Sequence, residues 1–289
     1  MKLATFTHDG TTRIGVVTDD GIVDLAVAAP ALPRDMIGFL TAGAAALDAA
    51  RAAASTGRRL ALADVVLEAP IPRPPKFLAL GLNYADHVKE SGFDTPSVPV
   101  MFNKQSTCVT GPYAPIHLPR VSPLLDYEGE LAFVIGRRCR HVPRDRAHEV
   151  IAGYCIVDDV SVRDWQLRTP TMTMGKSFDT HGPMGPWLVT PDEVGDPHAL
   201  QLRTWVNGEL RQDSNTNQLI FDCFAQVEHL STAFTLEPGD VVTTGTPSGV
   251  GGAMKPPRFL QVGDVVRIEI EKLGAIENTV VAEPGEMVL

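Results

Sequence analysis

Two glutamates inside an apolar, β-rich run constrain this chain more than any other feature. Glu128 and Glu130 lie two residues apart where the sequence reads DYEGELAFVIG. Acidic residues are depleted in strands, and at strand periodicity these two side chains point to one face of a sheet. The run therefore predicts a strand that carries a carboxylate pocket. The alternative is a pair of solvated acids on an exposed strand face.

A second acidic pair follows about twenty residues further on, at the end of another short apolar run. The segment GYCIVDD has the pattern of a buried strand, and it ends in Asp158 and Asp159. Carboxylates from two neighbouring strands form an all-oxygen pocket. Such a pocket suits Mg²⁺, Mn²⁺ or Ca²⁺ and suits Zn²⁺ poorly, so the sequence predicts a site for a hard cation.

The composition is that of an acidic, globular chain. Its 289 residues are 44% hydrophobic and 21% charged, which is enough to bury a full core. The net charge of −10 and the lack of a basic stripe argue against nucleic-acid and membrane partners. Small anionic substrates remain compatible with this charge, because a bound cation can invert the field of one pocket.

Cysteine usage and the N-terminus indicate a cytoplasmic protein. Cys108, Cys139, Cys155 and Cys223 are widely spaced and form no C-x-x-C pair, so neither structural zinc nor a disulfide framework is expected. The N-terminal residues MKLATFTHDG lack the apolar core of a signal peptide. No stretch approaches the roughly 18 apolar residues that a membrane helix needs.

Patterning along the chain divides it into two predicted domains. Residues 1–26 alternate in strand fashion, and residues 35–57 are an alanine-rich helical segment that ends at Gly57. A proline cluster at 69–76 is typical of a stiff linker. We therefore expect a small N-terminal α+β domain over 1–70 and a larger domain over 75–289.

The larger domain is expected to be mixed and β-rich, which makes the fold class α+β. Its pattern predicts a buried strand at 77–81, followed by a short helix at 84–91 capped by Asn83. The dipeptide Asn207-Gly208 predicts a type I′ hairpin. A longer helix is expected over 217–233.

The short helix carries a histidine and a glutamate on one face. His87 and Glu90 are spaced i and i+3, which makes them neighbours on a helix surface. A carboxylate at that distance fixes the imidazole tautomer and raises its basicity, as a general base requires. An ordinary surface His–Glu pair is the alternative, and these two residues taken alone favour it.

Three further polar residues follow the acidic centre. Arg163 and Gln166 come four and seven residues after Asp159, so they share a face if that segment is helical. There they could clamp a substrate carboxylate, although Arg163 could instead form a salt bridge that compensates the acids. Lys176 lies in a GKS tripeptide, but Pro170 occupies the position where a phosphate-binding loop needs glycine.

A glycine-rich loop at 244–252, TGTPSGVGG, follows a predicted strand. It lacks the G-x-G-x-x-G spacing of a dinucleotide site, and no helix is predicted after it. The loop either presents backbone N–H groups and the Thr246 hydroxyl to an anionic ligand, or it is a tight turn only.

Six segments taken in order resemble the fumarylacetoacetate hydrolase family. They are GLNYADHVKE, LDYEGELAFVIG, GYCIVDDVSVRDWQ, GKSFDTHGPMGPWLVT, VNGELRQDSNT and LEPGDVVTTGTPSGVG. The similarity covers about residues 75–282, and residues 1–70 resemble the small extra domain of many bacterial members. Those members include fumarylpyruvate and acylpyruvate hydrolases and 2-hydroxyhepta-2,4-diene-1,7-dioate isomerases.

The resemblance implies a fold and a set of site residues. The family fold is a β-roll of mixed sheets with few helices, commonly a homodimer. It assigns metal binding to Glu128, Glu130 and Asp159, catalysis to His87, Glu90 and Lys176, and substrate binding to Arg163, Gln166 and Thr246. His87 and Glu90 lie on a lid segment, which we place at 83–100.

The implied reaction depends on Mg²⁺ or Mn²⁺, with Ca²⁺ as another occupant of the site. It is the hydrolysis of a C–C bond in a 2,4-dioxo acid, such as an acylpyruvate or fumarylpyruvate, through a metal-stabilised enolate. The alternatives at the same site are an isomerase of a 2-hydroxymuconate-type or 2-hydroxyhepta-2,4-diene-1,7-dioate-type diacid and an oxaloacetate decarboxylase. A non-catalytic module with structural Ca²⁺ is disfavoured, because the acids come from separate strands.

Overall fold

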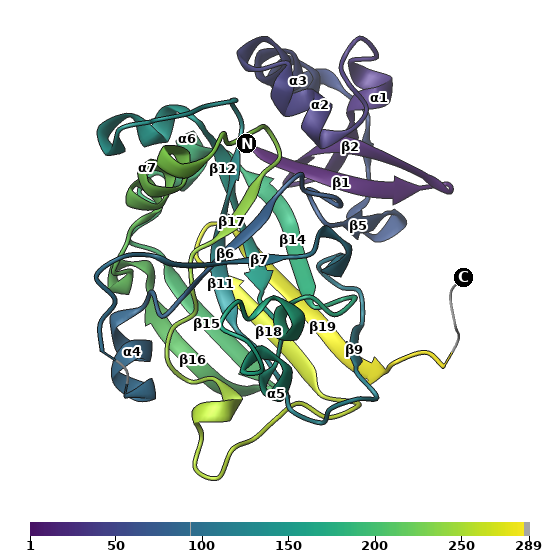
Figure 1. Ribbon diagram of the computed structural model, residues 1–289. Coiled ribbons are helices and arrows are strands. Elements are labelled where there is room, and N and C mark those ends of the chain that lie inside the picture. The colour runs from purple at the N-terminus through teal and green to yellow at the C-terminus, as the bar shows by residue number, and fades with distance from the viewer. Residues whose placement is uncertain (93, 286–289) are drawn as a thin grey trace.

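The molecule is built around one large sheet that runs through its centre (Figure 1). The structure is a computed structural model that describes residues 1–92 and 94–285. Residue 93 of the predicted lid and residues 286–289 of the predicted larger domain lie outside the described residues. In spatial order the main path of this sheet is β4 (Arg59–Leu60), β3 (Gly21–Asp24), β2 (Thr11–Thr18), β1 (Lys2–His8), β14 (Gly182–Val189), β12 (Ile151–Asp158), β11 (Gly129–Ile135), β17 (Val241–Thr243), β6 (Phe77–Gly81) and β7 (Val100–Lys104).

The remaining strands complete a mixed architecture. Two short strands, β5 (Val66–Glu68) and β8 (Val109–Thr110), pair with β1 and β14. A second sheet has the order β16 (Glu209–Asn215), β15 (Gln201–Val206), β18 (Val265–Ile270), β19 (Gly274–Ala282) and β9 (Ile116–Leu118), and β10 (Leu125–Asp126) pairs with β13 (Ser161–Val162). The pairs β17–β6, β14–β8 and β19–β9 are parallel, whereas the other pairs are antiparallel. The predicted β-rich, mixed fold is confirmed.

The N-terminal strands extend the central sheet. Strand β1 pairs antiparallel with β14, with Lys2 opposite Val189 and Leu3 opposite Leu188. Strands β1 to β3 form the expected antiparallel meander. The division at 70–75 into two domains stays a prediction from the proline cluster.

The predicted helix over 35–57 is two helices. Besides the short α1 (Leu25–Ala28), the N-terminal region contains α2 (Met36–Thr41) and α3 (Ala44–Thr56). The break falls at Gly43, whose φ of 70° is left-handed and cannot continue a helix. Gly57 follows the end of α3, as expected.

Strand β11 is buried on both faces, which explains its nearly continuous apolar sequence. Leu131 and Phe133 belong to the core shared with the second sheet, which includes Leu202 and Ile268. Ala132, between them, belongs to the other core, shared with the N-terminal strands and helices. Glu130 is therefore carried by one of the most enclosed strands of the fold, and Glu128 lies just before the start of that strand.

Two predicted helices of the larger domain differ at their starts. Asn83 does not cap α4 (Ala85–Ser91), because its buried side chain donates to the carbonyls of Phe221 and Thr244 instead. The helix expected over 217–233 begins only at Cys223, as α7 (Cys223–Ala233). Asp222 caps it by accepting from the amide of Ala225 at 2.8 Å.

Smaller predictions are confirmed. Asn207 and Gly208 join β15 to β16 with φ values of 53° and 78°, as a type I′ turn requires. The four cysteines are free thiols. Across the parts of the chain that the structure describes, no helix is long and apolar enough to cross a membrane.

Candidate metal and catalytic site

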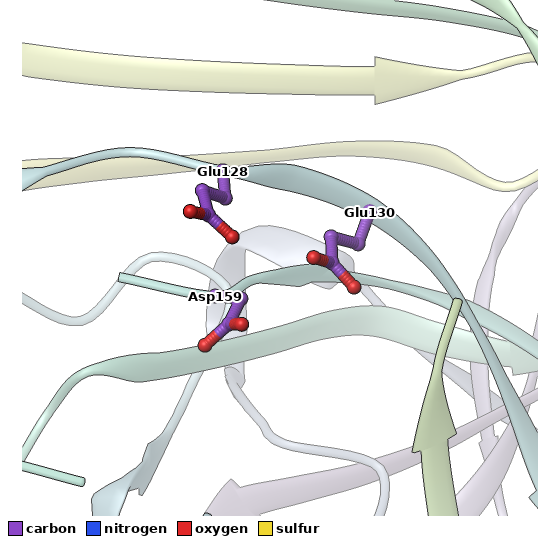
Figure 2. Close-up of side chains that lie close together, drawn as sticks. All are labelled: Glu128, Glu130 and Asp159. Carbon is purple, nitrogen blue, oxygen red and sulfur yellow. The ribbon is translucent and has the colours of Figure 1, made fainter. Parts of the chain in front are cut away.

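The three predicted acidic residues converge where β11 begins and β12 ends. Figure 2 shows the carboxylates of Glu128, Glu130 and Asp159 pointing toward one another. Each offers an oxygen atom, and these atoms lie within 4.8 Å of one another. Antiparallel pairing produces this arrangement, because Gly129 lies opposite Asp158 and the amide of Asp159 donates to the carbonyl of Glu128 at 2.9 Å. All three acids are buried.

Two buried lysines bind this acidic cluster. Lys176 Nζ donates to Glu128 Oε2 at 2.7 Å and to Asp159 Oδ2 at 2.8 Å. Lys104 Nζ donates to Asp159 Oδ1 at 2.6 Å, to the carbonyl of His181 at 3.0 Å and to the carbonyl of Lys176. We did not predict Lys104 from the sequence. The signal was a lysine that ends the largely apolar strand VMFNK, where an unpaired charge would be costly.

The cluster contains two more acidic than basic groups. Arg163 is the third base, since its Nε donates to Asp126 at 2.9 Å and its Nη1 to Glu128. Five acids face three bases, which leaves two acids in excess. The acids are Asp126, Glu128, Glu130, Asp158 and Asp159, and the bases are Lys104, Arg163 and Lys176.

The two acids in excess are Glu130 and Asp158, which form no salt bridge with the described residues. Burial, together with Asp159 and Glu128, raises the pKa of Glu130 well above its usual value. Glu130 Oε2 accepts from the amide of Gly245 at 2.9 Å, but its buried Oε1 has no hydrogen-bond partner. Burial also raises the pKa of Asp158 to about 7, and its Oδ2 is likewise without a partner.

Glu128 is in the opposite situation. Burial favours its neutral form, but Lys176, Arg163 and His87 outweigh this and lower its pKa to about 2. The cluster therefore combines the firmly ionised carboxylate of Glu128, an unpaired oxygen on Glu130 and two more acids than bases. This donor set fits a hard divalent cation held by Glu128, Glu130 and Asp159.

The predicted His–Glu pair forms on α4. His87 Nδ1 lies 3.3 Å from Glu90 Oε2, and the Glu90 carboxylate accepts from the amide of Gly249 at 3.0 and 3.2 Å. Only glycine fits at 249, because φ is +103° and an added Cβ would meet the carbonyl oxygen of Arg211 at 2.0 Å. The 244–252 loop thus orients the Glu90 carboxylate, which in turn orients His87.

The 244–252 loop presents its backbone N–H groups to the protein's own carboxylates. The amides of Gly251 and Gly252 each donate to Asp126 at 2.8 Å. Thr246 Oγ1 donates to the carbonyl of Gly129 at 3.0 Å and accepts from Gln212 Nε2 at 2.8 Å. The loop is therefore more than a tight turn, since it ties the acidic cluster to α4.

Arg163 and Gln166 lie together, but the secondary structure between Asp159 and these two residues differs from the single helix that was considered. Asp159 is not part of their helix, because residues 161–162 form β13 and α5 spans Arg163–Gln166. Arg163 Nη1 donates to Gln166 Oε1 at 2.9 Å in addition to its acidic partners. The guanidinium of Arg163 thus forms salt bridges that compensate the buried acids. This was the alternative to binding a substrate carboxylate in the sequence analysis.

One cavity of about 530 Å³ brings most of these groups to a common surface. Seven of the nine predicted site residues line it, namely His87, Glu90, Glu128, Arg163, Gln166, Lys176 and Thr246. Glu130 and Asp159 are absent from its lining. A cavity of about 580 Å³ beside Trp165 and Phe178 contains none of the nine, so its size alone does not mark it as the site.

Comparison with known proteins identifies the family. A model of the fumarylacetoacetate (FAA) hydrolase C-terminal region matches residues 76–281, and an Rv2993c-like N-terminal model matches residues 1–70. The chain belongs to the fumarylacetoacetate hydrolase family. The family predicted from the six motifs is confirmed, including the type with a small N-terminal region.

Relatives with different activities resemble this chain along its length. Oxaloacetate tautomerase fahd2, mitochondrial, from Xenopus laevis is 44% identical over 288 residues, which cover 97% of this chain and 90% of the relative. The structure of maleylpyruvate hydrolase from Sphingobium sp. SYK-6, in complex with manganese (II) ion and pyruvate, is 35% identical with a TM-score of 0.84 and covers 98% of this chain and 100% of that chain. The structure of 2-hydroxyhepta-2,4-diene-1,7-dioate isomerase from Mycobacterium marinum is 35% identical with a TM-score of 0.79 and covers 99% and 100%. The chain is a fumarylacetoacetate hydrolase family enzyme, and its carboxylate triad is a candidate metal site.

Proposed function

We propose that this enzyme is a divalent-metal-dependent hydrolase that cleaves a C–C bond of a 2,4-dioxo acid such as an acylpyruvate. The observation that carries the proposal is the meeting of two devices in one cavity of about 530 Å³. One is the acidic cluster around Glu128, and the other is the His87–Glu90 pair. His87 is near enough to Glu128 to contribute to lowering the pKa of that carboxyl group.

The residues divide the reaction between them. A divalent cation held by Glu128, Glu130 and Asp159 supplies Lewis-acid polarisation of the 2-oxo group when it is bound. His87, oriented by Glu90, takes a proton from water, and the hydroxide oxygen forms a bond to the C4 carbonyl carbon. The C3–C4 bond then breaks and its electron pair passes to the pyruvate fragment, which takes up a proton at C3. Lys176 balances the charge that develops near the acids.

The direct test is proton NMR of acetylpyruvate incubated with the protein, with and without Mg²⁺ or Mn²⁺. We expect pyruvate and acetate in equal amounts, formed only with the metal. An unchanged spectrum with either ion would refute hydrolysis of this substrate class. The same experiment is then run with oxaloacetate and with a 2-hydroxymuconate-type diacid, because decarboxylation and isomerisation need the same triad and a proton donor.

The Xenopus relative favours a second candidate, the tautomerisation of oxaloacetate. It is 44% identical over 97% of this chain, more than either solved hydrolase or isomerase structure described above. In that reaction His87 moves a proton between C3 and the 2-oxygen, and no water is added. Ultraviolet absorbance of the enol distinguishes the two candidates. Fast enol decay without any release of pyruvate would favour the tautomerase.

We also propose a cytoplasmic homodimer that binds neither nucleic acid nor membranes. The net charge of −10 supports the expected lack of nucleic-acid and membrane binding, because a negative surface repels phosphate groups, and the homodimer is what is common in the family. Light scattering coupled to size exclusion measures the oligomeric state, and a mass of about one chain would contradict the dimer.

A further inference from the structure

The positively charged side chains in the cavity wall already form salt bridges with buried acids. Among the described residues that line the cavity, Arg163 and Lys176 are the two permanent cations. Arg163 contacts Asp126 and Glu128, and Lys176 contacts Glu128 and Asp159. With a divalent cation in the acidic triad, the 2-oxo acid end of a substrate would bind beside it. Among the described lining residues, no further permanent cation is available for a charged group at the other end of the substrate.

The rest of the described wall is mainly apolar. Gly81, at the end of β6, lines the cavity, and a Cβ added there would make only ordinary van der Waals contacts. The nearest atoms to an added Cβ would be Met172 Cε at 3.8 Å, Phe102 Cε1 at 3.9 Å and Val100 Cγ1 at 3.9 Å. All four residues line the cavity, and we call them the apolar subsite. A side chain at 81 would occupy space that a ligand now can fill.

The apolar subsite adjoins the polar end of the cavity directly. Lys176 Nζ lies 5.2 Å from the centroid of the Phe102 ring, and Gln166 Nε2 lies 3.7 Å from Met172 Sδ. A substrate anchored at the acidic cluster therefore reaches the apolar subsite with the group beyond its 4-oxo carbon. The carboxylate of Glu90 also lines the cavity and repels a second anionic group there.

We infer that, among 2,4-dioxo acids, the enzyme selects those whose group beyond the 4-oxo carbon is uncharged and apolar, and discriminates against those that carry a second carboxylate there. The inference rests on the proposed function in one respect, which is that the 2-oxo acid end of the substrate binds at the acidic cluster. Its physical basis is the cost of burying a carboxylate without a partner, set against the gain from burying hydrocarbon on Val100, Phe102 and Met172. The selected class is therefore acylpyruvates with an alkyl or aryl acyl group rather than fumarylpyruvate or other diacids.

The first test measures binding, so it does not depend on turnover. The probes are 2-oxooctanoate and 2-oxooctanedioate, which are matched in chain length and have no 4-oxo group to be cleaved. Isothermal titration of the Mg²⁺-loaded protein is expected to give a Kd at least about tenfold lower for the monoacid, the scale on which pockets discriminate hydrophobic groups. Equal affinity, or tighter binding of the diacid, would overturn the inference.

The second test fills the apolar subsite. Gly81→Leu adds a side chain where an added Cβ makes only ordinary contacts, at a φ that is not left-handed. We expect the ratio of kcat/KM for octanoylpyruvate over that for acetylpyruvate to fall at least about tenfold. Gly285→Leu is the matched control. A Cβ added at Gly285 has no atom within 4 Å, and Gly285 does not line the cavity. If this ratio of kcat/KM values is unchanged in Gly81→Leu, the acyl group of the substrate does not bind in the apolar subsite.

The two tests separate this inference from the proposed hydrolysis. If 2-oxooctanoate binds selectively but no acylpyruvate is cleaved, the hydrolase proposal fails and the apolar subsite stands. If fumarylpyruvate is cleaved faster than an alkyl acylpyruvate, and 2-oxooctanedioate binds more tightly than 2-oxooctanoate, the hydrolase proposal stands and the inference about the apolar subsite fails. The wild-type titration remains decisive even if Gly81→Leu does not fold.

Discussion

The acidic cluster and the His87–Glu90 pair meet in one cavity but are held in opposite ways. Glu130 and Asp159 are fully buried, at the start of β11 and just after β12, and two lysines pair with the cluster. His87 and Glu90 lie on the seven-residue helix α4, and their side chains remain 14% and 26% exposed. A hydrogen bond from Gly249 to Glu90 ties this helix to the 244–252 loop.

The difference separates binding from proton transfer. A cluster embedded in central strands keeps its geometry and cannot be altered without disturbing the core. A pair on a short, partly exposed helix adds little to stability and can move as substrate enters. Substitutions in the first region should therefore change folding, metal binding and activity together, whereas substitutions in the second should change activity alone.

The largest effect is expected from Asp159→Ala. This change leaves Lys104 and half of the Lys176 contacts without their carboxylate, so the free energy of unfolding should fall by about 3–5 kcal/mol. Metal binding and activity should be lost as well. Urea unfolding and metal titration measure the two effects.

Asp145→Ala, an exposed acid in the 144–149 turn, is the control and should leave both quantities unchanged. Wild-type stability in Asp159→Ala would mean that the lysines do not depend on this carboxylate.

The second effect is confined to catalysis. His87→Ala should lower kcat by about 10²–10⁴-fold, the usual contribution of a general base. Its metal affinity and its urea midpoint should match those of the wild-type protein, because the hydrogen bond of the His87 ring is to Glu90 and not to one of the three proposed metal ligands. Full hydrolytic activity in this variant would show that another group activates the water.

The sequence predicted the acidic cluster better than it predicted the surrounding bases. Strand periodicity placed Glu128 and Glu130 together, and local pairing of β11 with β12 brought Asp159 to them. Lys104 was missed because its partners lie 55 and more residues away, and no local pattern encodes such a contact. The same limit applies to Asn83, which has the local features of a helix cap but bonds to residues 221 and 244.

The third effect tests metal binding at the acidic triad. Adding Mg²⁺ or Mn²⁺ at about 100 times its Kd should raise the free energy of unfolding by about 2.7 kcal/mol, and a chelator should reverse the gain. Wild type and His87→Ala should respond equally, whereas Asp159→Ala should not respond. A metal-induced gain in Asp159→Ala would mean that the ion binds elsewhere.

The smallest effect is expected from Glu90→Gln, which tests how the second region is oriented. The amide oxygen can still accept from Gly249, but the negative charge beside the His87 imidazole is lost. We therefore expect kcat to fall by about tenfold, less than in His87→Ala, because such a partner orients the base without taking the proton. Steady-state kinetics measure this effect. A kcat equal to that of the wild-type protein would show that the charge of Glu90 is not needed and that Glu90 only holds α4 against the loop.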